Sequence, residues 1–274
     1  MAGSRHLKSF RVSRATARVL GGGHPWILPD AESDDPADFR PGSLVRVVGP
    51  RSRELGWARM EGPGRIAARM WALPGESPGE DAFEVDFRVK AALAKRHRLL
   101  DRGSARLRVQ GRVYTEAVRL IHGEADGLPG LSVDWLGPLL RLGIWGKTTA
   151  GLLGEVVRSL ESHLPELGVE GLHPWVEVRH TATEGEPIRA AVRWRQLPSG
   201  AWLKAHMDAS SRVTVRERGL SFGVDPGLSE PMRPHPGVGL FLDQRENRAR
   251  LAKRAQRLRG NWLNLFAHTG AFSV

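Results

Sequence analysis

The stretch Trp262–Val274, WLNLFAHTGAFSV, determines which fold the sequence predicts. Its apolar residues Leu263 to Phe266 predict a strand, and the His-Thr-Gly that follows predicts a tight turn before a new helix. Gly270 would let the backbone approach a ligand without an intervening side chain. In a doubly wound sheet, ligands bind at this carboxyl end of a strand, where the next helix N-terminus favours a carboxylate or phosphate. Because the pattern is not GxGxxG, it gives little support to a nicotinamide dinucleotide.

The composition is that of a globular protein with a strong positive charge. The chain has 274 residues, of which 41% are hydrophobic, and a formal net charge of +11. Most of its cations are Arg, whose guanidinium groups pair phosphates bidentately and stack on bases. This favours a nucleic-acid partner. The alternative is that Arg is simply the usual surface cation of the source organism.

Several classes of protein are excluded or disfavoured. The chain contains no cysteine, which excludes disulfides, zinc–thiolate sites and thiol nucleophiles within these 274 residues. No apolar run approaches the roughly 18 residues of a membrane span, and no signal-peptide core is present. The basic residues 1–20 superficially resemble a mitochondrial presequence, but we interpret them as a basic first strand. We therefore expect a cytoplasmic protein without a membrane partner.

The first of three expected regions covers residues 1–75. Short, partly alternating apolar runs bounded by Gly and Pro predict a small β-barrel-like domain, as in GSLVRVVGP, LGWARM and RIAARMW. The Pro-, Gly- and acid-rich stretch Leu73–Asp81 predicts a linker after it.

The second region, residues 82–190, is expected to be an α+β domain. Apolar residues at helical spacing predict helices over Phe87–Arg102 and Thr149–Leu164. The stretches GPLLRLGIW and HPWVEVRH predict strands.

The third region, residues 191–274, is expected to contain connecting strands or hairpins, for example in VTVRERGLSFGVDP. A helix is predicted near Gln244–Arg259. Phe241 and Leu242 look like the end of a strand, and Asp243 is placed to cap this helix. Polar groups at such a transition could meet a cofactor or phosphate. A plain capped helix with a solvated face is at least as good an interpretation.

Two further stretches could carry chemistry. In GGGHPWILPDAE, His24 and Trp26 offer stacking surfaces for RNA bases, although a glycine turn with a Trp that anchors the barrel is the more common arrangement. In RLIHGEADGLPGLSVDW, Glu124, Asp126 and Asp134 could hold a divalent metal, but their spacing fits no calcium loop. Carboxylates that cap turn amides are the favoured explanation, so we expect no metal.

Taken in order, these stretches resemble one family over nearly the whole chain. HPWIL with GSLVRVV, RLIHGEADGLPGLSVD, FLDQRENR and LNLFAHTGAFSV are similar to class I S-adenosylmethionine-dependent RNA methyltransferases, typified by bacterial 23S rRNA cytosine-5 methyltransferases. The resemblance implies a PUA-like β-barrel, a central α+β domain and the start of a Rossmann-like α/β domain, as in the N-terminal two-thirds of that family. It also implies S-adenosylmethionine as cofactor and RNA, in particular 23S rRNA, as partner.

The resemblance also implies which residues bind the cofactor. Residues of the first cofactor motif and of the motif that lines the pocket would be Asn264, Phe266, Thr269, Gly270, Phe272, Asp243, Gln244 and Arg245. Two departures concern His268, where the family more often has Tyr or Cys, and the loop GLSEPMRPHPGVG, which is longer than usual and lacks the customary Lys-Thr.

The resemblance further implies segments that these residues do not contain. The family has an acid that holds the ribose, an Asp-Pro-Pro-like segment and Cys thiolates. Carbon 5 of cytosine becomes nucleophilic only after a nucleophile adds to carbon 6, so without Cys we expect no such catalysis from this chain. A single parallel strand also needs neighbours. We therefore expect a truncated methyltransferase with no catalytic residues of its own. The alternative is a non-catalytic RNA-binding protein that retains the PUA-like and central domains.

Overall fold

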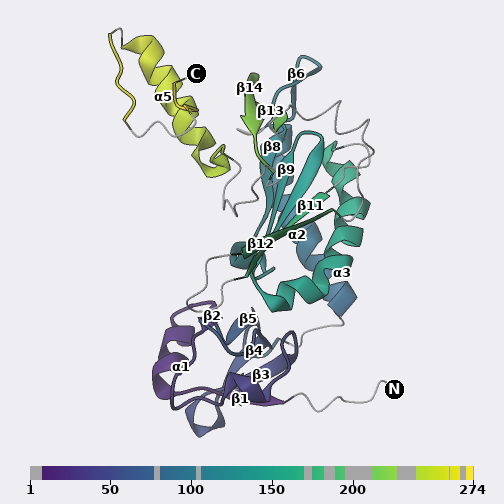
Figure 1. The fold of residues 1–274 in the computed structure, drawn as a ribbon, viewed down its shortest axis with the longest axis vertical. Coiled ribbons are helices and arrows are strands. Elements are labelled where there is room, and N and C mark those ends of the chain that lie inside the picture. Colours follow the sequence, from purple (N-terminus) through teal and green to yellow (C-terminus); the bar gives the residue numbers. More distant parts are fainter. Residues whose placement is uncertain are drawn as a thin grey trace.

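A computed structural model describes residues 8–76, 81–102, 106–169, 175–181, 189–194, 212–226, 239–258, 260–265 and 270–273. In Figure 1 an N-terminal sheet lies at one end of the molecule, a second sheet covered by two helices lies in the middle, and the C-terminal helix α5 lies at the far end.

The N-terminal region is a curled five-stranded sheet with one helix. Its elements are β1 (Ser9–Arg11), α1 (Arg14–Gly21), β2 (Trp26–Ile27), the 3-10 turns Pro36–Asp38 and Pro50–Ser52, β3 (Leu44–Val48), β4 (Glu54–Met60) and β5 (Ala68–Ala72). The strand order is β1-β3-β4-β5-β2, and only β1 and β3 run parallel. The predicted strands of this region are confirmed. Helix α1 was not predicted, because the basic N-terminal stretch was interpreted as strand alone.

Helix α1 begins at a network of hydroxyl groups around one carboxylate. The Ser13 hydroxyl accepts a hydrogen bond from the backbone N–H of Thr16, as an N-cap residue does. Asp30 Oδ2 accepts hydrogen bonds from the hydroxyls of Ser13, Thr16 and Ser33. Burial raises the pKa of Asp30, but these hydroxyls and the backbone N–H of Glu32 together lower it from 3.8 to about 2.

The central region is a second five-stranded sheet with two long helices. Its elements are α2 (Asp81–Asp101), β6 (Arg108–Val109), β7 (Arg112–Val113), β8 (Ala117–His122), the 3-10 turn Gly123–Asp126, β9 (Leu131–Leu136), β10 (Leu139–Ile144), α3 (Lys147–His163), the 3-10 turn Leu164–Leu167, β11 (Trp175–Thr181) and β12 (Arg189–Trp194). The sheet order is β12-β11-β10-β9-β8, and only β10 and β11, which α3 connects, are parallel.

Strands β9 and β10 form the middle of this core, since all twelve of their residues are buried. On one face α2 and α3 pack against them, and the predicted apolar faces of both helices are confirmed by the burial of Val89, Leu93 and Leu100, and of Leu153, Val156, Val157, Leu160 and Leu164. On the other face Ala117, Leu136 and Leu139 pack against a C-terminal hairpin. The central sheet is therefore packed on both faces, and the C-terminal hairpin has a fixed position against it.

The C-terminal region contains this hairpin, β13 (Val213–Glu217) and β14 (Leu220–Val224), followed by the 3-10 turn Leu242–Gln244 and helix α5 (Arg245–Arg257). The hairpin and helix were predicted. The prediction that Phe241 and Leu242 end a strand is wrong, because Leu242 opens a 3-10 turn. No helix among the described residues is long and apolar enough to cross a membrane.

We expect Asp30→Asn to lower the free energy of unfolding by about 1 kcal/mol near pH 6, a value that allows for solvent screening at this exposed position. A carboxylate whose pKa is lower in the folded chain stabilises it above the unfolded pKa, and this contribution disappears as the pH falls through the folded value. The two proteins should therefore converge between about pH 4 and pH 2. Urea titrations at a series of pH values measure this.

Asp38→Asn, a change at an exposed aspartate of the same region, is the matched control and should leave the unfolding free energy within about 0.5 kcal/mol of wild type. A gap between wild type and Asp30→Asn that stays constant down to pH 2 would contradict the assigned network.

Candidate functional site

Helix α5 is fastened to the C-terminal hairpin by a buried carboxylate, and to the central sheet by one further hydrogen bond. Glu217, at the end of β13, accepts hydrogen bonds from Arg248 Nε at 2.8 Å and Arg248 Nη2 at 2.7 Å. Arg245 Nε lies 3.4 Å from the same carboxylate, and Arg245 Nη2 donates to the carbonyl of Ala117 on β8. All three ionic side chains are at least nine-tenths buried, and burial lowers the pKa of Arg245.

This anchor brings two predicted cofactor segments together. The Arg248 guanidinium lies 5.8 Å from the ring centre of Phe272. Ala271 is buried in the same apolar cluster as Leu240 and the outer face of the central sheet. The segment that contains Phe241–Arg248 and the segment 270–273 therefore share one surface.

Within the second segment, short hydrogen bonds hold a turn. The backbone N–H of Ser273 donates to the Gly270 carbonyl at 2.7 Å, and Asn264 Nδ2 donates to the Ser273 hydroxyl at 2.7 Å. Gly270 has a φ of +76°, which a side chain would strain, and no atom of the described residues lies within 4 Å of the position that its Cβ would take. The described residues therefore leave room for a ligand beside this backbone.

The remaining cofactor candidates differ in their surroundings: one is exposed, one is at a helix terminus, one is buried in an ion pair, and two lie outside the described residues. Asp243 is exposed and accepts a hydrogen bond from Gln244 Nε2, and Gln244 rather than Asp243 stands at the N-cap of α5. The predicted cap at Asp243 is thus wrong. Arg245 is used in the Glu217 anchor. Phe266 and Thr269, like His268, lie outside the described residues.

The strand predicted over Leu263–Phe266 is not observed in its described part. Residues 263–265 have no strand pairing, and the side chains of Leu263 and Leu265 are 82% and 67% exposed. The apolar pattern was interpreted as that of a strand buried on both faces, and such a strand forms only when neighbouring strands and helices cover it.

A second charged cluster joins the N-terminal and central regions. Glu61 Oε1 accepts from Arg69 Nε at 2.9 Å, and Glu61 Oε2 accepts from the backbone N–H of Lys147 at 2.6 Å and of Thr148 at 3.3 Å. The carboxylate of one region thus caps the first turn of α3 in the other. A Cβ at Gly146 would collide with it, which accounts for the glycine there.

The proposed RNA contacts His24 and Trp26 lie beside this cluster. Trp26 Nε1 donates to Glu124 Oε1 at 2.7 Å, and the Arg69 guanidinium also reaches Glu124 Oε1 at 2.7 Å. Burial opposes ionisation of Glu124, but the hydrogen bonds from Trp26 and Arg69 together lower its pKa. The Trp26 indole therefore ties the two regions together, and 37% of its surface stays exposed. His24 Nδ1 is 3.0 Å from the Trp26 carbonyl oxygen.

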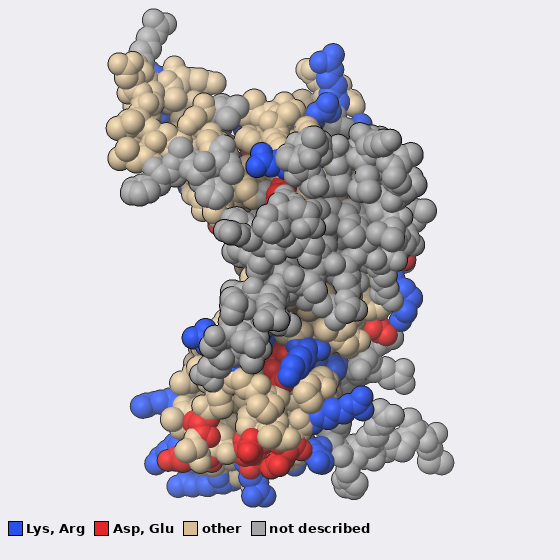
Figure 2. Space-filling view, viewed as in Figure 1, with Lys and Arg blue, Asp and Glu red and all other residues tan. Residues whose placement is uncertain are grey.

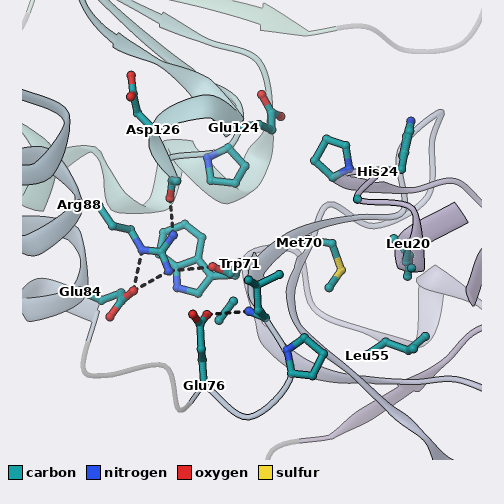
Figure 3. A pocket seen from close by; sticks show the side chains of 18 of the residues that line it. Leu20, His24, Leu55, Met70, Trp71, Glu76, Glu84, Arg88, Glu124 and Asp126 are labelled. Carbon is teal, nitrogen blue, oxygen red and sulfur yellow. Dashed lines mark hydrogen bonds and ion pairs between the residues drawn. The ribbon is translucent and has the colours of Figure 1, made fainter. Parts of the chain in front are cut away.

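A cavity of about 1010 Å³ opens at the same junction. Figure 3 shows His24, Leu20, Leu55 and Met70 on its N-terminal side and Glu84 and Arg88 on the side of α2. Arg88 closes one wall, because it donates to the carbonyls of Gly127 and Trp71 at 2.6 and 2.7 Å and lies over the Trp71 ring.

The three carboxylates considered as metal ligands are separately paired. Glu124 binds Trp26 and Arg69, Asp126 binds Lys95 and Arg96 and accepts from the backbone N–H of His122, and Asp134 binds Arg119. The described residues contain no cluster of three or more His, Cys, Asp or Glu side chains arranged to hold a metal. Arg side chains, more than turn amides, thus account for these acids.

The N-terminal region, with its curled sheet and helix α1, corresponds to a known domain family. Residues 10–72 match the family model of the PUA-like domain. The expectation of such a domain is confirmed, and residues 10–72 are called the PUA-like domain below. The cluster around Glu61 and Glu124 therefore joins the PUA-like domain to the central sheet.

Most of the chain is also similar to proteins named as ribosomal RNA large subunit methyltransferases. One from Deinococcus radiodurans is 29% identical over 97% of this chain and 58% of its own length. A methyltransferase I from Alteromonas mediterranea is 27% identical over 91% of this chain and 54% of its own length. The chain thus spans a little more than half the length of these relatives.

Solved structures show the same fold. One described as a methyltransferase complexed with SAH matches 97% of this chain and 59% of that chain, with a TM-score of 0.67 and 17% identity. Another, described as a SAM-dependent methyltransferase from Streptococcus mutans, matches with a TM-score of 0.65 and 16% identity. At these identities the likeness establishes the fold alone.

Sequence reasoning missed Glu217, Glu61 and Arg69. A signal was present for Glu217, because the alternation of VTVRE places it on the same face as the buried Val213 and Val215. A carboxylate on a buried face requires a cation, and Arg245 and Arg248 share one face of a helix. No local pattern marks Glu61, whose partners on α3 lie 86 and 87 residues away.

We expect Glu217→Gln to lower the free energy of unfolding by about 3 kcal/mol, because it leaves two buried guanidinium groups without a counter-charge. Urea denaturation followed by circular dichroism measures this. Glu155→Gln removes the carboxylate of a pair with the exposed Arg158 and should cost less than about 1 kcal/mol. Equal decreases in the two variants would contradict the anchor.

We expect Glu61→Gln to cost about 2 kcal/mol, because an amide NH2 would face either the α3 N–H groups or Arg69. Because the hydrogen bonds of Glu61 join two regions, the PUA-like domain should also unfold before the central sheet, which calorimetry would record as a second transition. The control Glu32→Gln, at an exposed acid of the PUA-like domain, should leave a profile like that of wild type. An unchanged profile for Glu61→Gln would refute this role of the junction.

Proposed function

We propose that this chain acts in S-adenosylmethionine-dependent methylation of RNA, with large-subunit 23S rRNA as the substrate. The observation that carries the proposal is that similarity to rRNA large subunit methyltransferases extends over 91% and 97% of this chain, well beyond the PUA-like domain. The match to the Deinococcus radiodurans relative therefore reaches beyond the PUA-like domain into the central and C-terminal regions.

The chemistry of the described cofactor candidates fits S-adenosylmethionine. Asp243 offers an exposed carboxylate that could accept from hydroxyl or ammonium groups, Phe272 offers a partly exposed aromatic face, and Gly270 leaves its backbone open. Asn264 would hold the turn through Ser273. When bound, the cofactor supplies the methyl group. Arg245 would act through the Glu217 anchor, as a positioning residue. Phe266 and Thr269 remain proposed ligands by resemblance.

The PUA-like and central domains would bind the RNA. Figure 2 shows Lys and Arg side chains around the rim of the N-terminal region, where they would meet phosphates. His24, at the junction cavity, remains the proposed base contact there, and Trp26 retains an exposed part of its ring for stacking.

Cytosine carbon 5 as the target atom rests on the resemblance. Thiolate addition to carbon 6 would need a cysteine, and these 274 residues contain none. We therefore assign cofactor and RNA binding to this chain, and assign no catalytic residue within it. The second candidate, a non-catalytic RNA-binding protein, is favoured by the same lack of cysteine and differs by having no affinity for the cofactor.

Calorimetry with S-adenosylmethionine separates the two candidates. We expect micromolar binding to the 274-residue chain, and Asp243→Asn should weaken it about tenfold, the effect of removing a charged hydrogen bond of about 1.4 kcal/mol. Asp38→Asn, far along the chain in the PUA-like domain, should leave the affinity unchanged. A wild-type chain that binds RNA at low salt but releases no heat with the cofactor would reject the methyltransferase assignment and favour the RNA-binding protein.

A further inference from the structure

Helix α5 carries a row of four exposed cations on one face. Arg250, Lys253, Arg254 and Arg257 are spaced i, i+3, i+4 and i+7, which places them side by side along two turns. The structure shows no ion pair for any of the four with a described carboxylate. Glu246, the one acid in the sequence of α5, is also exposed and makes no ion pair with Arg250. These four residues are called the α5 basic face below.

The α5 basic face points away from the body of the protein. At 3.6 residues per turn, the mean direction of its side chains lies about 160° around the helix from that of Arg245 and Arg248. Because those two arginines are bound to the buried Glu217, the opposite face is directed outward. In Figure 1, α5 stands beyond the edge of the central sheet.

The arginines of the described core contrast with this row. Arg69, Arg88 and Arg96 each bind a carboxylate and a backbone carbonyl, so their charges are compensated within the fold. Within the part of the chain that the structure describes, the cations of the α5 basic face have no such partners. Clustered, outward-facing guanidinium groups of this kind are suited to bind an external polyanion.

The dimensions of the row fit a nucleic-acid backbone. Seven residues of helix rise about 10 Å, a length over which successive phosphates of one strand can each meet a cation of the row. A membrane surface fits less well. An interfacial helix needs an apolar face opposite its charges, and α5 carries the buried ions Arg245 and Arg248 there.

We propose that the α5 basic face is a docking surface for the phosphate backbone of RNA. This inference rests on the proposed function, to which it adds the element that holds the RNA beside the cofactor segment. Phe272 lies against Arg248 of the same helix, so RNA bound along α5 would pass close to the candidate cofactor wall. The contacts are to phosphates, so the surface contributes affinity without sequence preference.

The test compares three forms of the 274-residue chain for binding to a fluorescent RNA hairpin over a series of KCl concentrations. The first variant carries R250Q, K253Q, R254Q and R257Q, in which glutamine preserves helix propensity. The second carries K90Q, R98Q, R102Q and R158Q, which removes the same number of exposed Arg and Lys charges from the region of α2 and α3, outside the rim of the N-terminal region. Circular dichroism verifies that both variants are folded.

For the α5 variant we expect affinity to fall at least tenfold at low salt. The slope of log K against log salt should decrease in magnitude by about 3, because each phosphate that is no longer neutralised reduces it by roughly 0.9. The affinity of the matched control should fall less than threefold. These results together would support the proposal.

Three other outcomes would overturn it. Equal decreases in affinity for the two variants would mean that net charge alone matters. An α5 variant with wild-type affinity and slope would show that RNA binds elsewhere. Loss of binding to phosphatidylserine vesicles with RNA affinity unchanged would make the face a membrane surface. Failure of the wild-type chain itself to bind RNA at low salt would instead refute the proposed function.

Discussion

The arrangement of the PUA-like domain against the central region depends on the hydrogen bonds of the Glu61 carboxylate. It belongs to the PUA-like domain, yet it satisfies the first N–H groups of α3 and holds Arg69, which in turn reaches Glu124. Helix termini leave donors that water or a capping group must satisfy. Because a neighbouring domain supplies the cap here, the fold of α3 and the orientation of the PUA-like domain are linked energetically.

The elements that the sequence predicted well are those with local signals. The long helices α2 and α3 show apolar residues at helical spacing, and β3, β4 and β10 are short apolar runs between turns. The apolar run that begins at Leu263 predicted a strand that is not observed, because such a run forms a strand only where neighbouring strands and helices cover it. Whether an apolar run is buried is decided by tertiary contacts, which the run itself does not encode.

The candidate site was predictable only where a local sequence signal marks a residue. Gly270, a glycine in a turn, was expected to leave the backbone open, and its positive φ agrees with that role. Trp26 was proposed as a base contact from its residue type, with a structural anchor as the more common alternative. Its indole N–H also bonds to Glu124, 98 residues away, which no spacing rule could indicate. Long-range pairing between charged groups is the main information that the local patterns lack.

The way α5 is attached has a mechanical consequence. Apolar helix contacts are non-directional and tolerate a small roll about the helix axis. Arg248 grips Glu217 through two parallel N–H···O bonds, and Arg245 reaches both the same carboxylate and a strand carbonyl. Such directional contacts fix the rotational phase of the helix. The side chains on the exposed side of α5 therefore keep a constant orientation relative to the central sheet, because the helix cannot rotate about its own axis.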